Sequence, residues 1–283
     1  MTPESQRWTA LATHIAQGYA DAPGIEGILI GGSVARGLAD VNSDVDLFVF
    51  CRQFPDKSLR QTAVDRVNGE RWRAHDSRDQ GLLRDCFHAD DGRIDVEFVL
   101  VSAYEALIRD VLANHDISRA KQGLLGGLLD AQIIQDSGLV AHWRRQIAQY
   151  PDGLQQRVVE HHLLIDPLWV AEIYARKRGD LLYLCDALCR VANAVLGLLH
   201  GLNRRYQPNE YKRLDWIVSH FQLAPENIAN RLRDILQGPP LDGVQKLEQI
   251  VAETFDLLET HLPTLDMDAA RAEFTTDTDT EPE

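Results

Sequence analysis

The pattern of apolar residues changes near residue 100, and this change constrains the fold more than any other feature of the sequence. Upstream, short apolar runs typical of buried strands alternate with stretches whose apolar residues recur every three or four positions, as in an amphipathic helix. Downstream, only the helical spacing continues. The sequence therefore predicts two domains: an α/β (α+β) domain with a short mixed sheet over residues 1–101, and an all-α helical bundle over residues 102–261.

Three apolar runs predict strands in the first domain. GIEGILIGG (24–32) and VDLFVFC (45–51) are each bounded by turn-forming residues. The third, RIDVEFVLV (93–101), follows the turn sequence HADDG, so we expect it to form a hairpin with about residues 82–87. Helical patterns lie around these runs, at 4–20 and 57–69.

The second domain shows apolar residues at helical spacing almost throughout. Pro167 falls inside one of the helical stretches and is expected to kink or split it. The last segment, residues 262–283, is polar and acidic and is expected to be disordered. The predicted helical stretches are 102–113, 137–149, 154–178, 180–206, 225–237 and 241–260.

Charge and composition narrow the class of protein. The formal net charge is −14, and the acidic tail accounts for a large part of it. An acidic body disfavours a stable nucleic-acid partner, because binding a polyanion needs clustered Lys and Arg. Four cysteines without metal-ligand spacing fit a reducing compartment. The N-terminus lacks the apolar core of a signal peptide, and charged residues interrupt the best candidate for a membrane span. We expect a cytoplasmic protein without a membrane partner.

The segment ILIGGSVARGLADVNSDVDLFVF (28–50) contains the residues that point to chemistry. A buried strand is expected to end at Gly31 and Gly32, with Ser33 as the N-cap of a short helix over residues 34–38. The two glycines allow a ligand to approach the backbone, and the free N–H groups at a helix start attract phosphate. This part of the segment predicts a phosphate cradle.

Carboxylates follow the cradle at strand spacing. Asp44 and Asp46 point to the same face of a strand, and such a pair repels unless a cation lies between its members. Oxygen ligands of this kind suit Mg²⁺, which commonly also binds substrate phosphates. Asp95 is placed to add a third carboxylate from a neighbouring strand, and Glu97 shares its face. A phosphate cradle beside a metal site predicts phosphoryl or nucleotidyl transfer.

Gly-Ser, a ten-residue gap and Asp-x-Asp at the start of an apolar strand together resemble the nucleotidyltransferase (polymerase β-like) superfamily. GSVARG and SDVDL are most similar to the aminoglycoside and lincosamide nucleotidyltransferases, which pair an α/β catalytic domain with a helical bundle. The resemblance implies that Asp44 and Asp46 bind Mg²⁺ and that Asp95 is a third metal ligand or a general base. It also implies nucleotide-binding roles, which fall to Gly32, Ser33 and Arg36.

A second segment, LNRRYQPNEYKRL (202–214), looks like the nucleotide-facing region of some family members. There Lys212 is a candidate phosphate contact, together with Arg204 and Arg205. The alternative is that this Lys is simply solvated, as most lysines are.

The leading hypothesis is an enzyme that uses Mg²⁺ to move a nucleoside monophosphate, AMP from ATP in the first place, onto a hydroxyl group of a small molecule. An aminoglycoside-like acceptor is consistent with the acidic body. Two alternatives stay open: an antitoxin-type nucleotidyltransferase that AMPylates a protein, and a non-catalytic nucleotide-binding regulator. The sequence also leaves a homodimer open, and it disfavours a polymerase acting on RNA.

Overall fold

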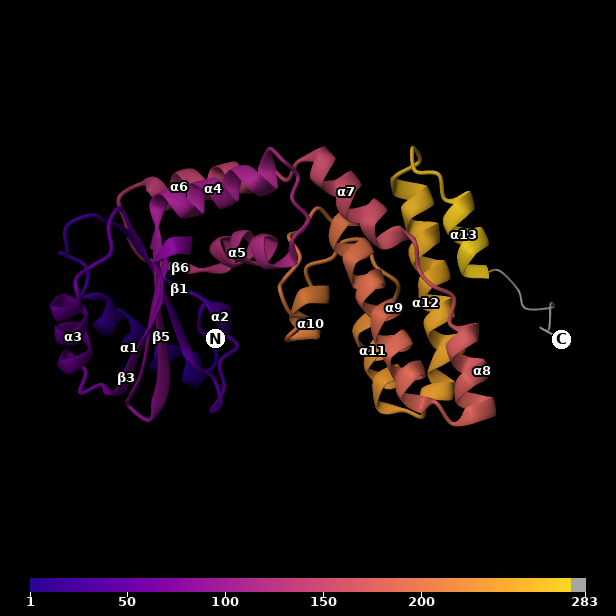
Figure 1. Cartoon of the computed structure of the whole chain (residues 1–283), viewed down its shortest axis with the longest axis horizontal. Helices are drawn as coiled ribbons and strands as arrows, with labels where there is room; N and C mark the ends of the chain where they lie inside the picture. Colours follow the sequence, from indigo (N-terminus) through magenta and orange to yellow (C-terminus); the bar gives the residue numbers. More distant parts are fainter. Residues whose placement is uncertain (276–283) are drawn as a thin grey trace. The chain divides into compact units, whose positions relative to one another are not determined.

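The computed structural model describes residues 1–275, and the chain forms two compact units that divide between Gln149 and Tyr150 (Figure 1). The first unit combines a sheet with helices, and the second consists of helices in its described part. The mixed α/β fold followed by a helical region is therefore confirmed.

A six-stranded mixed sheet forms the centre of the first unit, in the order β3-β4-β5-β2-β1-β6. β2 and β5 are parallel, and every other neighbouring pair is antiparallel. The three expected strands and the hairpin of β4 with β5 are all present. The strands are β1 (Ile25–Ile30), β2 (Val45–Cys51), β3 (Glu70–Ser77), β4 (Leu82–Ala89), β5 (Gly92–Leu100) and β6 (Gln132–Asp136).

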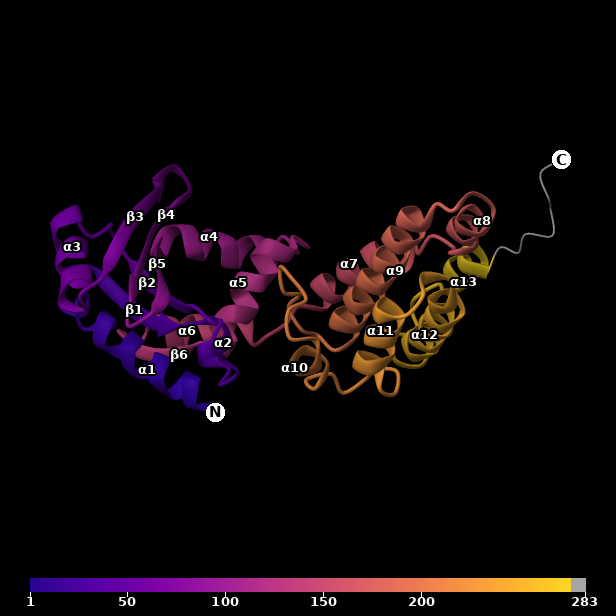
Figure 2. The ribbon, with the colours of Figure 1, turned by 90° about the horizontal axis from the view of Figure 1, so that it is seen from below.

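Helices cover both faces of this sheet (Figure 2). On one face, α1 and α3 bury Trp8 and Val64 against the strands. On the other face, the ring of Phe50 packs against Tyr104 of α4 and Trp143 of α6, with ring centroids 4.8 and 5.1 Å away. The helices are α1 (Pro3–Ala16), α2 (Gly32–Ala35), α3 (Lys57–Arg66), α4 (Val101–Leu112), α5 (Arg119–Asp130) and α6 (Leu139–Ile147), with a 3₁₀ turn at Arg78–Gln80.

The expected domain boundary after residue 101 needs correction. The first unit extends to Gln149, because β6 pairs with β1 at the edge of the sheet and the buried Trp143 completes the core on that face. The sequence of β6, QIIQD, offers only two apolar residues in a row. Such a short run gives no strand period to detect.

The second unit is helical, as expected, and Pro167 lies in the break between two helices rather than in a kink. Val195 and Leu199 of α9 lie at the centre of its core, among residues of the surrounding helices. The helices are α7 (Asp152–Leu163), α8 (Trp169–Arg178), α9 (Leu181–Leu202), α10 (Leu214–Val218), α11 (Ile228–Gln237), α12 (Pro240–His261) and α13 (Asp268–Thr275).

Helix α9 is, among the described residues, the one helix long and apolar enough to cross a membrane by length and composition. Half of its most apolar stretch is buried inside the unit. A buried apolar helix is also what the core of a helical bundle requires. Asp186 and Arg190 interrupt its apolar run, and for this reason the sequence alone did not predict a membrane span.

The expectation of a disordered tail from residue 262 is wrong for the part that the structure describes. Met267 and Ala270 are buried in the helical core, and Arg271 of α13 forms ion pairs with Asp256 and Glu259 of α12, both at 2.7 Å. An acidic segment can thus be ordered when a few apolar residues reach a core. The last eight residues of the expected disordered segment, 276–283, lie outside the described part of the chain.

The corrected boundary predicts which fragment of the chain folds alone. A fragment of residues 1–149 should unfold cooperatively on heating, whereas a fragment of residues 1–101 should show no cooperative transition. The shorter fragment exposes the edge of β1 and removes Tyr104 and Trp143, the rings that cover Phe50. Circular dichroism during thermal unfolding measures this. Equal melting temperatures for the two fragments would restore the boundary at residue 101.

Candidate functional site

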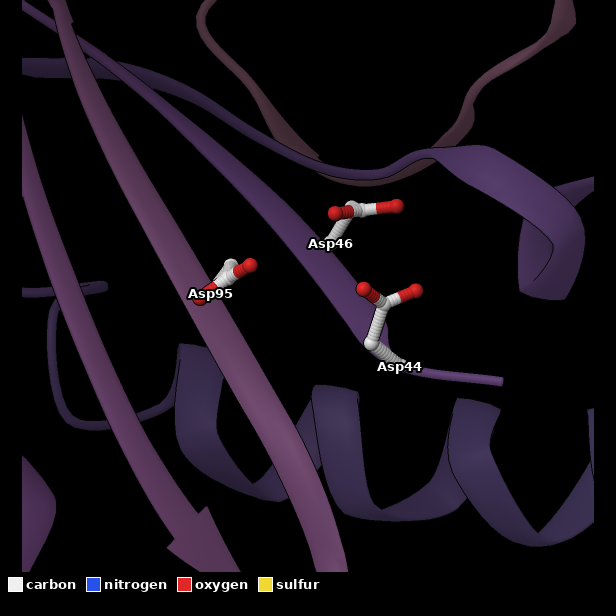
Figure 3. A group of neighbouring side chains, drawn as sticks. All are labelled: Asp44, Asp46 and Asp95. Carbon is white, nitrogen blue, oxygen red and sulfur yellow. The ribbon is translucent and has the colours of Figure 1, made fainter. Parts of the chain in front are cut away.

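Three carboxylates meet where β2 and β5 run side by side (Figure 3). Asp46 is the second residue of β2, and its register partner on the parallel strand β5 is Asp95. Asp44 directly precedes β2, and its side chain lies on the same side. One oxygen from each residue lies within 4.8 Å of the others. The predicted three-carboxylate cluster on two neighbouring strands is therefore present.

Strand alternation explains why these side chains share a face. Val45 and Leu47 are completely buried in the core that α1 and α3 cover, so the residue between them points to the opposite face. Three carboxylate oxygens at this spacing form a hard, anionic donor set, which suits Mg²⁺ or a similar divalent cation. The chemistry of the donor set fits the metal that the sequence analysis expected.

Two glycines allow the backbone before α2 to approach the carboxylates. A Cβ atom on Gly32 would lie 2.3 Å from Oδ2 of Asp46, and a Cβ atom on Gly31 would lie 2.4 Å from Cε2 of Phe48. Gly32 also has a φ of +61°, which disfavours other residues. A side chain at position 32 would thus collide with the Asp46 carboxylate, and a side chain at position 31 would collide with an aromatic ring.

The start of the short helix differs from the expectation. The N-cap is Gly31, the helix α2 begins at Gly32, and Ser33 is its second residue rather than its cap. The carbonyl of Ser33 accepts a hydrogen bond from the N–H of Leu38 at 2.9 Å. The helix begins two residues earlier than expected because Gly31 supplies the extended conformation that an N-cap needs.

Two arginines, which the sequence analysis missed, surround Asp95. Arg84 of β4 and Arg93 of β5 both contact its Oδ2, with Nη2 atoms at 2.5 and 3.0 Å. Nε of Arg84 lies 3.8 Å from Glu97. The signal was present in the predicted hairpin, because its register places Arg84 opposite Glu97 and Cys86 opposite Asp95. The sequence did not show where this register begins.

Burial and charge separate the protonation behaviour of the carboxylates. Burial, and then the negative charges of Asp44 and Asp95, raise the pKa of Asp46 to about 6. Burial also raises the pKa of Glu97. For Asp95, burial acts in the same direction, but hydrogen bonds from Cys86 and Arg84 outweigh it and hold the pKa below its usual value. Asp95 therefore stays ionised more readily than Asp46 or Glu97.

The remaining residues proposed for nucleotide binding lie outside the cluster. Arg36 follows α2 and forms an ion pair with Asp130 at the end of α5, at 3.1 Å. Lys212 belongs to the second unit, where its Nζ lies 2.7 Å from Glu210. In the same unit, Arg204 forms an ion pair with Asp152. Nucleotide contacts by these residues stay predictions.

Two parts of the chain match models of known protein families. Residues 18–85, which extend from before β1 into the start of β4, match the family model of the nucleotidyltransferase domain, and Asp95 lies beyond the matched stretch. Residues 119–216 match a domain of unknown function, DUF4037. No curated protein matches the chain.

Among solved structures, a nucleotidyltransferase-like protein from Exiguobacterium sibiricum is similar to this chain, with 15% sequence identity over 90% of this chain and 78% of that one. The TM-score of 0.33 is too low to assign the fold by itself. Within residues 18–85 the structure places a strand, a glycine turn and the strand that carries Asp46. This part of the chain matches a nucleotidyltransferase domain.

Proposed function

We propose that the protein transfers a nucleoside monophosphate, AMP from ATP in the first instance, onto a hydroxyl group of a small molecule in a Mg²⁺-dependent reaction. The single observation that supports this most strongly is the group of three carboxylate oxygens within 4.8 Å, two of which belong to the stretch that matches the nucleotidyltransferase domain. ATP and Mg²⁺ are both plentiful in the cytoplasm. Four free cysteines are consistent with that compartment.

Asp44, Asp46 and Asp95 are the residues that would hold the metal. When bound, Mg²⁺ supplies positive charge that offsets the negative charge of the phosphates and makes the attacked phosphorus more electrophilic. The chain's own contribution is to hold three anionic oxygens in place before the substrate arrives, which avoids reorganisation later.

Asp95 is better suited to a metal ligand than to a general base. Two guanidinium groups contact its carboxylate and keep its pKa low, so it is a weak acceptor for the proton of an attacking hydroxyl. A low pKa is no obstacle to metal binding, because the ligand must be ionised anyway. Of the two roles that the resemblance left open, we therefore assign the first.

For the triphosphate we propose Gly32, Ser33 and Arg36 of the first unit. Arg36 is paired with Asp130 and partly exposed, so to bind a phosphate its guanidinium would have to leave this carboxylate. A planar guanidinium suits a phosphate as well as a carboxylate. Ser33 lies in the turn of backbone that Gly32 brings beside Asp46.

Replacing Asp46 by Asn should abolish transfer while the fold remains intact. The test incubates each protein with labelled ATP, Mg²⁺ and a panel of hydroxyl-bearing small molecules, and measures pyrophosphate release. We expect the wild type to release pyrophosphate with some acceptor, and the Asp46→Asn variant to lose at least 100-fold of the rate, an order of magnitude typical for a lost charge-stabilising group. Normal turnover in a folded Asp46→Asn variant would exclude this carboxylate as a metal ligand.

The same substitution should stabilise the metal-free protein at high pH. The pKa of Asp46 in the folded protein, about 6, lies above its ordinary value of 3.8, so its proton favours folding below about pH 4. That contribution is lost as the pH rises through 6. At pH 8, with metal chelated, Asp46→Asn should be more stable than the wild type by about 1 to 3 kcal/mol. Urea unfolding at pH 4 and pH 8 measures the difference, which should shrink at pH 4.

The stability of the metal-free protein should fall as the pH rises, whereas its affinity for Mg²⁺ should increase. Asp46 must lose its proton before it can bind Mg²⁺, so affinity should rise with pH and level off above 7. The apparent Kd for Mg²⁺ at pH 5 should be about ten-fold weaker than at pH 7. Isothermal titration calorimetry without nucleotide checks this. A Kd that does not change between pH 5 and pH 7 would contradict the proposed ligand.

Replacing Gly32 by Ala tests the close approach of the backbone to Asp46. The new Cβ would displace the Asp46 carboxylate, so the affinity for Mg²⁺ should fall at least ten-fold. Positive φ costs about 1 to 2 kcal/mol for Ala, independently of any clash. Gly179→Ala is a matched control, because Gly179 also has a positive φ but a Cβ there meets nothing within 4 Å. Both variants should lose similar stability, and only Gly32→Ala should lose metal affinity.

A further inference from the structure

A pocket continues from the carboxylate cluster along the same face of the sheet. Phe48 follows Asp46 by two residues on β2, and Glu97 follows Asp95 by two residues on β5, so both side chains stay on that face. Both line the pocket, and so does Gly32. α4 and α5 supply the opposite wall, and the cavity measures about 270 Å³. The whole pocket lies within the first unit.

The walls of this pocket are mostly apolar. Leu29, Phe48 and Val99 line the sheet side, and Leu107 and Leu128 line the helix side. The one hydroxyl group on the helix side, that of Tyr104, donates a hydrogen bond to the carbonyl of Leu124 at 3.0 Å and is thus already engaged. Apart from Tyr104, the polar side chains among the described lining residues are those of Glu97 and of the exposed Gln80.

Glu97 is the one charged side chain among the described residues that line the pocket. It is partly buried, and it lies between the carboxylate cluster and the apolar walls. A ligand in the pocket can therefore direct a hydroxyl group or a single cationic group toward Glu97. Against the apolar walls, further polar groups would be buried without partners, which is unfavourable.

We propose that this pocket binds the apolar body of the acceptor, and that the acceptor is a compact, largely apolar alcohol or phenol rather than a polycationic aminosugar. The inference rests on the proposed function and narrows its substrate class. The volume is at the small end of the range for ligand sites, roughly 300 to 1,000 Å³, so it admits about one substituted ring. The hydroxyl of such a molecule lies toward the carboxylate end.

The pocket suits neither an aminosugar nor a nucleobase well. An aminosugar carries several amino and hydroxyl groups on every ring, and Glu97 can pair with only one or two of them. A nucleobase has ring nitrogens and exocyclic groups along its edge that require partners of the same kind. An aryl or branched alkyl group requires none, and it gains from removal of apolar surface from water.

Gly127 gives a way to fill the pocket without disturbing the fold. It lies in the middle of α5 and lines the pocket, and a Cβ atom on it would meet nothing within 4 Å. A larger side chain there points into open space and also raises helix propensity. Gly127→Leu should therefore occupy the cavity with no loss of melting temperature. Ala120→Leu is the matched control, because Ala120 is exposed on the same helix and does not line the pocket.

The experiment uses the full chain and two readouts. Saturation-transfer NMR, without ATP or metal, measures binding of 2-phenylethanol and of kanamycin A. Calorimetry with Mg²⁺ measures binding of the non-hydrolysable α,β-methylene analogue of ATP. We expect the wild type and Ala120→Leu to bind 2-phenylethanol, with at least a five-fold loss of signal in Gly127→Leu. Affinity for the ATP analogue should stay within two-fold in all three proteins.

Two results would overturn the inference. A ten-fold loss of affinity for the ATP analogue in Gly127→Leu would show that the pocket holds the nucleobase. Failure of the wild type to bind 2-phenylethanol, or binding that Gly127→Leu leaves intact, would show that the pocket does not select apolar alcohols. Neither readout depends on turnover. If 2-phenylethanol binds as expected and no acceptor supports pyrophosphate release, the proposed function fails while the ligand class of the pocket stands.

Discussion

The parallel pairing of β2 with β5 holds together carboxylates that would otherwise repel each other. Two negative charges at this separation cost of order 3 kcal/mol at an effective dielectric constant of about 20. The sheet withstands this because Asp46 and Asp95 are register partners and the residues beside them are completely buried on the opposite face. The cluster is thus formed without a metal, and burial of the apolar core behind it offsets the free-energy cost of the charge repulsion.

The arginines explain why the pKa values of Asp46 and Asp95 shift in opposite directions. Arg84 and Arg93 form ion pairs with Asp95 and hold its pKa low, so Asp95 stays ionised. Asp46 has no such partner among the described residues, and burial together with the negative charges of its neighbours raises its pKa to about 6. One ligand is therefore charged at all ordinary pH values, while another gains its charge near neutrality. A divalent cation that binds here would find Asp95 already ionised, whereas Asp46 would have to lose its proton below about pH 6.

The sequence predicted the carboxylate cluster because alternation along a strand is a local property, visible in Asp-x-Asp within an apolar run. It did not predict features that depend on distant partners. β6 is a strand only because the edge of β1 is free to pair with it, and α13 is ordered because Met267 and Ala270 reach the helical core. Arg93 lies only two residues from Asp95 in the sequence, but the hairpin register was needed to show that arginines surround this carboxylate.

The same alternation that brings the carboxylates together also determines what lies beyond them. On one face, successive residues of β2 and β5 change from aspartates to Phe48 and Glu97, and then to Phe50 and Val99. Each step along a strand face is about 7 Å, so anionic and apolar surfaces lie within the length of one small molecule. A molecule in the pocket thus reaches the carboxylate cluster only if its reactive group lies within about one ring of its apolar body. The spacing of residues along the two strands, rather than any single residue, would limit the size of the proposed acceptor.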